Sequence, residues 1–190
     1  MKGRWRVDGA ELRSELEKHH RESYGWALSC CQRNPAEAEN ILQTAYLKVL
    51  DGKARFHGKS SFKTWLFSVI RLTAIDHRRR ELLGRLRLVR HEQTRTRATH
   101  NFEDEVYRSE IQTIFLNAIG ALPRRQQEVL QLVFYHDLSL AEAAEVMSIG
   151  LGSARTHYER GKKQLRQAMA GSGIGNESEL GRRKHQALVP

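Results

Sequence analysis

Residues 139–169 read SLAEAAEVMSIGLGSARTHYERGKKQLRQAM, two helical patterns separated by a short turn. The first pattern is short and apolar, whereas the second carries many Arg and Lys residues. Between them, Ser148-Ile149-Gly150 predicts a turn, and Gly150 and Gly152 would permit a tight backbone path there. The stretch therefore predicts a pair of helices joined by a tight turn, with the second helix strongly basic.

Helical spacing divides each of these helices into an apolar face and a polar face. The first would bury Leu140, Ala143, Ala144 and Met147, and the second would bury Ala154, Tyr158, Gly161 and Leu165. The polar face of the second helix would carry Ser153, Arg155, Thr156, Glu159, Arg160 and Lys163. Such a face suits a DNA groove, because Arg can bond guanine edges while Ser, Thr and Lys hold phosphates. The pattern alone also allows a helical hairpin with an ordinary solvated basic face.

The charge balance favours a polyanionic partner. The 190 residues contain 32 Lys and Arg against 22 Asp and Glu, a net charge of +10. A charge this positive favours binding to nucleic acid or to an anionic membrane, and it tips the two readings of the basic helix toward DNA.

The rest of the composition indicates the fold class and the cellular compartment. With no sustained strand alternation and only three prolines, we expect an all-α fold. Cys30 and Cys31 are adjacent, so a disulfide between them would be strained, and the lack of other Cys fits a reducing cytosol. Neither a signal peptide nor an apolar stretch long enough to cross a membrane is visible. We expect a soluble cytoplasmic protein without membrane insertion.

Capping residues predict where the helices of the N-terminal part begin and end. Asp8 would cap a helix that runs to about Cys31, and Asn34-Pro35 would begin the next helix, which ends at Asp51-Gly52. The predicted buried stripe of that second helix is Ala38, Ile41, Leu42, Ala45, Val49 and Leu50. A third helix, capped by Ser60 or Ser61, has the apolar stripe Phe62, Trp65, Leu66, Val69, Ile70 and Thr73.

These boundaries predict two small helical domains joined by a flexible linker, the second containing a helix-turn-helix. The first domain would span residues 8–82, and the Arg- and Thr-rich segment 83–101 would be the linker. The second domain would span residues 102–169, followed by a flexible tail over 170–190.

Three segments carry a family resemblance. Residues 121–166 read ALPRRQQEVLQLVFYHDLSLAEAAEVMSIGLGSARTHYERGKKQLR, which resembles the promoter-binding C-terminal domain of bacterial sigma factors. Residues 34–50, NPAEAENILQTAYLKVL, resemble the helix of the same family that docks on RNA polymerase. Residues 62–80, FKTWLFSVIRLTAIDHRRR, resemble the helix that reads the minus-10 element. The chain resembles an extracytoplasmic-function (ECF, group 4) sigma factor of the sigma-70 family.

The resemblance implies a protein that directs core RNA polymerase to promoters without covalent chemistry, cofactor or metal, and that an anti-sigma factor regulates. The implied minus-35 contacts are Ser153, Arg155, Thr156, Arg160 and Lys163, with Arg124 and Arg125 on phosphates. The implied minus-10 contacts are Phe56, Lys59, Ser60, Ser61, Lys63, Arg71, Arg78 and Arg79. The implied polymerase-docking residues are Glu37, Glu39, Asn40, Gln43 and Tyr46. Structural alternatives remain for two features of the helix over residues 62–80: Trp65 as a core aromatic, and residues 78–80 as a solvated helix end.

Rival classes fit the sequence less well. An enzyme is disfavoured because there is no glycine-rich phosphate loop, no HExxH and no pair of carboxylates in an apolar setting. Adjacent residues on a helix point about 100° apart, so neither His19-His20 nor Cys30-Cys31 makes a metal chelate by itself. Aromatic content of 7% is low for an RNA-stacking protein. The main alternative is a helix-turn-helix regulator that binds DNA without docking on core polymerase.

Overall fold

The structure is a computed structural model in which residues 9–89 and 118–171 are described, and every regular element in these residues is a helix. The N-terminal part contains α1 (Gly9–Lys18), α2 (His20–Cys30), α3 (Pro35–Leu50) and α4 (Phe62–Val89). The C-terminal part contains α6 (Arg124–Phe134), α7 (Leu140–Met147) and α8 (Leu151–Gly171). The expected all-α class is confirmed. None of these helices combines the length and apolar character needed to cross a lipid bilayer.

The first predicted helix is broken in two. The chain leaves helical geometry at His19, between α1 and α2, so the expectation of one helix reaching Cys31 is wrong. His19 lies between Glu15 and Glu22, with ring nitrogens 3.7 and 3.3 Å from their carboxylates, and its ring stacks on Phe62. The two carboxylates lie at helical spacing from His19, whereas the contact with Phe62 joins residues that are far apart in the sequence.

The helix α3 begins and ends where its capping residues predict. The Asn34 side chain accepts a hydrogen bond from the backbone of Glu37 at 3.2 Å, and Pro35 occupies the first helical position. Gly52 adopts a left-handed backbone just beyond the end of the helix, with φ 69°. The prediction for Leu50 is wrong, since that side chain is 46% exposed rather than buried.

The helix α4 is longer than its pattern suggested. The Ser61 hydroxyl accepts the backbone N–H of Thr64 at 3.1 Å, which confirms Ser61 as a cap. The helix then continues to Val89, so residues 83–89, expected to be linker, are helical. Their sequence, LGRLRLV, has one Gly and no Pro, so nothing in it forces the helix to end earlier. The rest of the predicted linker, residues 102–117 and the tail from 172 lie outside the described residues.

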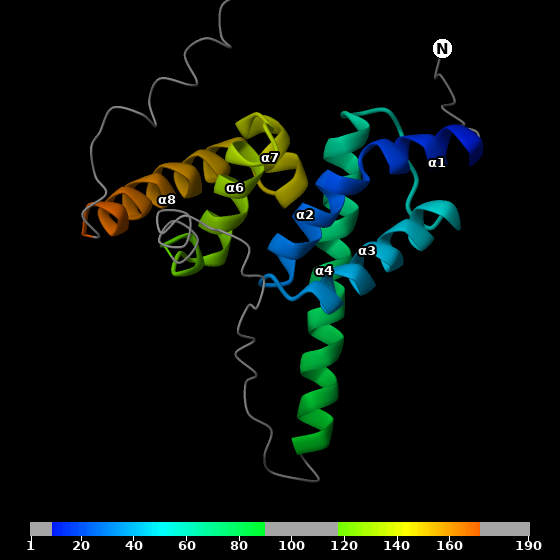
Figure 1. Ribbon diagram of the computed structural model, residues 1–190, viewed down its shortest axis with the longest axis horizontal. Coiled ribbons are helices and arrows are strands. Elements are labelled where there is room, and N and C mark those ends of the chain that lie inside the picture. The colour runs from blue at the N-terminus through cyan, green and yellow to red at the C-terminus, as the bar shows by residue number, and fades with distance from the viewer. Residues whose placement is uncertain (1–8, 90–117, 172–190) are drawn as a thin grey trace, which may run out of the picture.

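The two helical parts pack directly against each other. Figure 1 shows α4 through the middle of the molecule, with α3 on one side and α6, α7 and α8 on the other. A single apolar cluster joins Trp26, Phe67 and Ile70 of the first part to Val129 and Met147 of the second. The linker therefore connects two parts that also share a core.

His136 lies at this junction, in the turn after α6. Its ring meets the rings of Phe67 and Trp26 edge-on, at centroid distances of 4.8 and 5.8 Å. Burial lowers the pKa of His136 to about 4, and the nearby Lys63 ammonium acts in the same direction. The folded chain therefore holds this imidazole neutral.

The helix-turn-helix is formed by α7 and α8. Ser139 and Glu142 form a capping box at the start of α7, as each side chain bonds the other residue's backbone N–H. The left-handed residue of the turn is Ser148, with φ 54°, whereas the positive-φ glycines of the described chain are Gly52 and Gly58. The expectation that Gly150 and Gly152 provide the unusual backbone path is therefore wrong.

Gly161 has a packing role instead. A Cβ at this position would lie 3.0 Å from Leu130 Cδ1 and 3.2 Å from Gln126 Cβ, both on α6. Since Leu130 is only 1% exposed, it has little room to move away. Gly161 therefore allows α8 to cross α6 closely.

We predict opposite effects for two Gly-to-Ala changes in α8. Gly161→Ala should lower the free energy of unfolding by about 1 kcal/mol, because overpacking against α6 outweighs the gain in helix propensity. Gly152→Ala should raise it by up to about 0.5 kcal/mol, because a Cβ there meets no atom within 4 Å. Urea unfolding of both variants measures the difference, and a stabilised Gly161→Ala protein would contradict the close crossing.

A second prediction concerns pH. The unfolded chain protonates His136 near pH 6.5, and the folded chain protonates it near pH 4. The contribution of this group to the free energy of unfolding is therefore fully present above pH 6.5 and is lost as the pH falls toward 4. Between pH 7 and pH 5 the free energy of unfolding should fall by about 2 kcal/mol on account of this group. His136→Gln should remove most of that dependence, while His57→Gln, at an exposed position, should keep it. Equal pH dependence in wild type and His136→Gln would refute the assignment.

Candidate nucleic-acid interface

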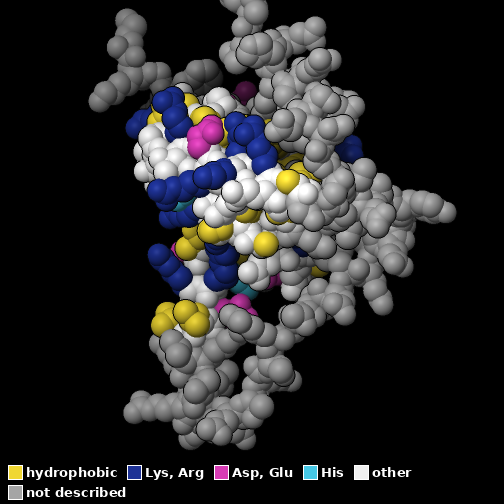
Figure 2. All heavy atoms as spheres, turned by 90° about the vertical axis from the view of Figure 1, so that its left-hand side faces the viewer, with side chains coloured by type: hydrophobic (Ala, Val, Ile, Leu, Met, Phe, Trp, Pro, Cys, Tyr) yellow, Lys and Arg dark blue, Asp and Glu magenta, His cyan; other side chains and the backbone are white. Residues whose placement is uncertain are grey.

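The polar face of α8 is exposed as the sequence predicts. Ala154, Gly161 and Leu165 are buried on the opposite face of the helix. The exposed residues are Ser153, Arg155, Thr156, Arg160 and Lys163. Lys and Arg side chains gather on the side of the molecule where α8 lies (Figure 2). Within the described residues, this side of α8 is therefore exposed to solvent.

The two arginines at the start of α6 differ in their contacts. Arg125 is exposed, and its Nη1 donates to the Met147 carbonyl at 3.4 Å, at the end of α7. Arg124 turns toward the N-terminal part, where its Nη2 donates to the Cys30 carbonyl at 2.9 Å. Of this pair, Arg125 lies beside the helix-turn-helix, while Arg124 is engaged within the protein.

The loop before α4 carries an aromatic cluster. Phe56, Phe62 and Trp65 have ring centroids 5.2–5.5 Å apart. All three side chains are partly exposed, and Lys59 and Ser61 in the same loop are exposed. Trp65 is thus partly exposed in this cluster and also packs against the central apolar core. The arrangement offers apolar ring surface and a cation close together in sequence.

Several cations predicted for the minus-10 element are not free in this structure. The Lys63 ammonium donates to Glu22 Oε1 at 2.9 Å and to the His136 carbonyl at 2.8 Å. Arg71 is 4% exposed and forms an ion pair with Glu128. Arg78 donates to the Cys30 carbonyl at 3.3 Å, whereas Arg79 is exposed. Of these four cations, Arg79 is therefore exposed, while Lys63, Arg71 and Arg78 contact protein oxygens. Ser60, another residue predicted for the minus-10 element, is partly exposed.

The exposed side of α3 carries three of the predicted docking residues. Glu39, Asn40 and Gln43 are exposed together, and Leu47 and Leu50 continue the same side at 59% and 46% exposure. The prediction missed these two leucines. Their spacing of four and seven residues from Gln43 is the signal that could have found them.

The other two predicted docking residues are partly buried and make contacts within the protein. Glu37 turns toward α4, where its carboxylate is 3.7 Å from His77 Nδ1. Tyr46 is half-buried, its hydroxyl 3.3 Å from His20 Nδ1, and burial raises the pKa of Tyr46.

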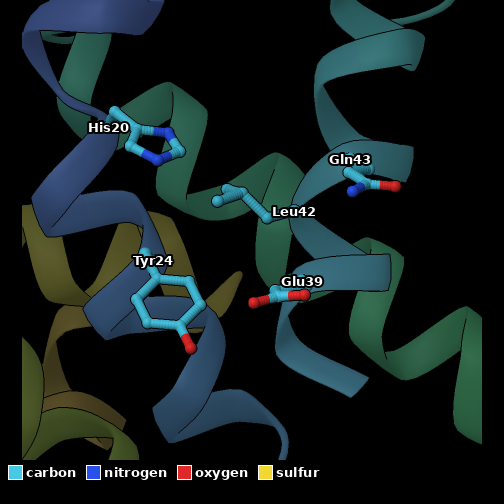
Figure 3. A pocket seen from close by; sticks show the side chains of 5 residues that line it. All are labelled: His20, Tyr24, Glu39, Leu42 and Gln43. Atoms are coloured by element: carbon cyan, nitrogen blue, oxygen red, sulfur yellow. The ribbon is translucent and has the colours of Figure 1, made fainter. Parts of the chain in front are cut away.

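A cleft adjoins the exposed side of α3. His20 and Tyr24 of α2 face Glu39, Leu42 and Gln43 of α3 across it (Figure 3). Its volume is about 480 Å³. Glu39 and Gln43 therefore belong both to the exposed side of α3 and to the rim of this cleft.

The adjacent cysteines are buried and unreactive by environment. Cys30 and Cys31 are 1% and 2% exposed, and both are free thiols. Burial raises the pKa of Cys31 to about 12 and that of Cys30 well above its usual value. Both therefore serve as core residues here.

Two segments of the chain match known protein families. Residues 16–82 match Sigma-70 region 2, and residues 112–165 match Sigma-70, region 4. The two matches together span more than half of the chain, and region 2 precedes region 4. The first covers α2, α3 and most of α4, and the second covers α6, α7 and most of α8.

Relatives match along nearly their whole length. The chain is 26% identical to the RNA polymerase sigma factor YlaC of Bacillus subtilis, over 84% of this chain and 95% of that protein. It is 28% identical to the ECF RNA polymerase sigma factor SigX of the same species, over 80% of each chain.

A solved structure shares the fold. It is the sigma factor RpoE from Bartonella quintana in complex with the anti-sigma factor NepR, with TM-score 0.64 and 19% identity, over 84% of this chain and 97% of that one. CnrH in complex with the cytosolic domain of CnrY follows with TM-score 0.59 and 16% identity, over 86% of this chain and 90% of that one. With regions 2 and 4 both present and ECF sigma factors among its relatives, the chain belongs to the sigma-70 family of RNA polymerase sigma factors, in the ECF group.

Proposed function

We propose that the exposed faces of α8 and α3 perform the two tasks of this sigma factor, promoter recognition and core polymerase binding. The observation that carries the proposal is their separation: each helix buries one side in the protein and offers the other to solvent, on different sides of α4. A helix-turn-helix regulator that acts alone would need the first of these faces but not the second.

The face of α8 enters the major groove at the minus-35 element. In a helix-turn-helix the second helix reads base edges, chiefly with residues near its N-terminus. Ser153, Arg155 and Thr156 lie in the first two turns of α8, and Arg160 follows one turn later. Arg side chains supply bidentate contacts to guanine, while Arg125 and Lys163 neutralise phosphates beside the groove.

The loop before α4 binds the opened minus-10 strand. Unstacked bases bind to aromatic rings with cations nearby, and Phe56 with its ring neighbours supplies the stacking surface. Lys59 and Arg79 are exposed for the backbone phosphates, and Ser60 and Ser61 offer hydroxyls at the start of the helix.

The side of α3 formed by Glu39, Asn40, Gln43, Leu47 and Leu50 docks on core polymerase. An acidic residue and two exposed leucines on one helix side combine charge complementarity with apolar contact area. Asn40 and Gln43 add hydrogen-bonding groups between them.

The protein acts without covalent chemistry and in the cytoplasm, where bacterial RNA polymerase works. An anti-sigma factor is its proposed regulator, since a structural neighbour, the sigma factor RpoE of Bartonella quintana, was solved with the anti-sigma factor NepR. The α2–α3 cleft beside the docking side of α3 is the place where such a partner would compete with polymerase.

The minus-35 assignment predicts a loss of promoter activity. Arg155→Ala or Arg160→Ala should weaken promoter binding by about 1–3 kcal/mol if the residue reads a base edge. Run-off transcription from a minus-35-dependent promoter measures this loss. Arg13→Ala, an exposed arginine on α1, is the matched control. Unchanged transcription with either α8 variant would remove that residue from the interface.

The docking assignment predicts a loss of polymerase affinity. Glu39→Lys should weaken binding to core polymerase by roughly three- to tenfold, as an exposed charge pair becomes a repulsion. Binding of a labelled chain to core enzyme gives the affinity, and the unfolding curve should stay unchanged because Glu39 is exposed. The control is Glu145→Lys on the exposed side of α7. Equal losses for both variants would mean that only net charge matters.

A further inference from the structure

The carboxylate of Glu128 binds two arginines at once. Its Oε2 accepts from Nε and Nη2 of Arg71 at 3.1 and 3.0 Å, and its Oε1 accepts from Nε of Arg124 at 3.1 Å. The side chains of Arg71 and Glu128 are 5% and 6% exposed. Glu128 and Arg124 belong to α6 and Arg71 to α4, so this contact joins the two parts of the chain.

Both arginines have a promoter role in the family pattern, Arg71 at the minus-10 element and Arg124 on phosphates near the minus-35 element. Two guanidinium groups around one pair of anionic oxygens is also the arrangement in which arginines hold a phosphate. In this structure the carboxylate of Glu128 therefore occupies the position that promoter phosphate would need on both side chains.

Other contacts between the two parts also engage side chains on or beside the predicted DNA surface. Lys63 of α4 donates to the His136 carbonyl beyond α6, and Arg124 donates to the Cys30 carbonyl at the end of α2. Thr64 of α4 donates to Glu142 Oε1 of α7 at 3.3 Å. Each contact crosses between the two parts, and each uses a side chain on or beside the predicted DNA surface.

The apolar cluster and the ion pair contribute differently to closure, because the cluster that joins α4 to α6 and α7 supplies the apolar burial. Desolvation of a buried ion pair largely offsets its Coulomb attraction, so the pair fixes how α6 sits on α4 more than it stabilises the contact. When the parts separate, Arg71 and Glu128 both regain water, and a polyanion can then take the arginines. Removing only Glu128 leaves the buried Arg71 guanidinium without its anion and beside the partly exposed Arg124, which disfavours closure strongly.

We propose that Glu128 is an intramolecular competitor of promoter phosphate, and that α6 and α7 must leave α4 before Arg71, Arg124 and Lys63 can bind DNA. In the closed chain the outer sides of α3 and α8 remain exposed, so polymerase and minus-35 DNA can reach it first. The inference rests on the proposed function for the identity of the DNA, but closure itself can be measured without it.

The test uses the full chain with two fluorophores. Labels attach to cysteines introduced at the exposed positions Glu17 on α1 and Gln167 on α8, since the native Cys30 and Cys31 are buried. The wild-type chain should show high energy transfer, and Glu128→Gln should shift the population to low transfer. Glu128→Gln should also bind single-stranded DNA of random sequence at least tenfold more tightly at low salt, because phosphate binding does not depend on sequence.

Two further variants test whether the change in energy transfer comes from loss of closure rather than from a change in net charge or from loss of the fold. Glu145→Gln makes the same charge change on the exposed side of α7 and should leave energy transfer as in wild type. The double variant Arg71→Met with Glu128→Leu replaces the pair by apolar side chains, which should restore high transfer without tighter DNA binding. Circular dichroism establishes that each variant stays helical.

The outcomes distinguish this inference from the proposed function. If Glu128→Gln matches wild type in both energy transfer and DNA affinity while both proteins bind core polymerase, the competitor role is wrong and the sigma function stands. If neither protein binds core polymerase, the proposed function fails, and a low-transfer Glu128→Gln chain would still establish closure.

Discussion

The packing of α2, α3 and α7 around α4 is the constraint on which the rest of the structure depends. Leu66, Phe67 and Ile70 of α4 are completely buried, and the Trp26 indole donates to the Phe67 carbonyl at 3.0 Å. Because α4 has neighbours on several sides, each neighbouring helix is left with one side for solvent. The exposed side of α3 is a consequence of this arrangement, whereas α8 packs on α6 and α7 and keeps its polar side toward solvent.

Charge explains why the same packing can be temporary. A chain with net charge +10 must keep its cations hydrated or paired, and Lys63, Arg71 and Arg124 each donate to a protein oxygen across the two parts. Such contacts are specific in geometry but exchangeable for phosphate oxygens. In the proposed closed state, these contacts would cover the cations until DNA arrives.

Sequence patterns predicted those features that depend on helical period and local capping. The two faces of α8, the Asn34-Pro35 start of α3 and the Ser61 cap of α4 follow from residues close together in the chain. The helix break at His19 and the burial of Arg71 and His136 depend on partners far away in sequence, such as Phe62 and Glu128. No periodicity contains that information, so these features emerge only from the folded chain.

The same contrast between local pattern and distant partners applies to the predicted functional residues. The polar residues of α8 and the acidic side of α3 were assigned to surfaces, and both are exposed. For Arg71 and Lys63, residue type suggested DNA, whereas the structure shows what they bind in its absence. Leu47 and Leu50 were overlooked because leucines on a helix are first assigned to a core.

The most direct measurement is binding of the purified chain to bacterial core RNA polymerase, followed by run-off transcription on fragments of the source genome. The account predicts a stable complex with core and transcripts that begin at defined sites, whose upstream sequences share two elements. A chain that fails to bind core polymerase but shifts duplex DNA by itself would contradict the account and favour a regulator that acts alone.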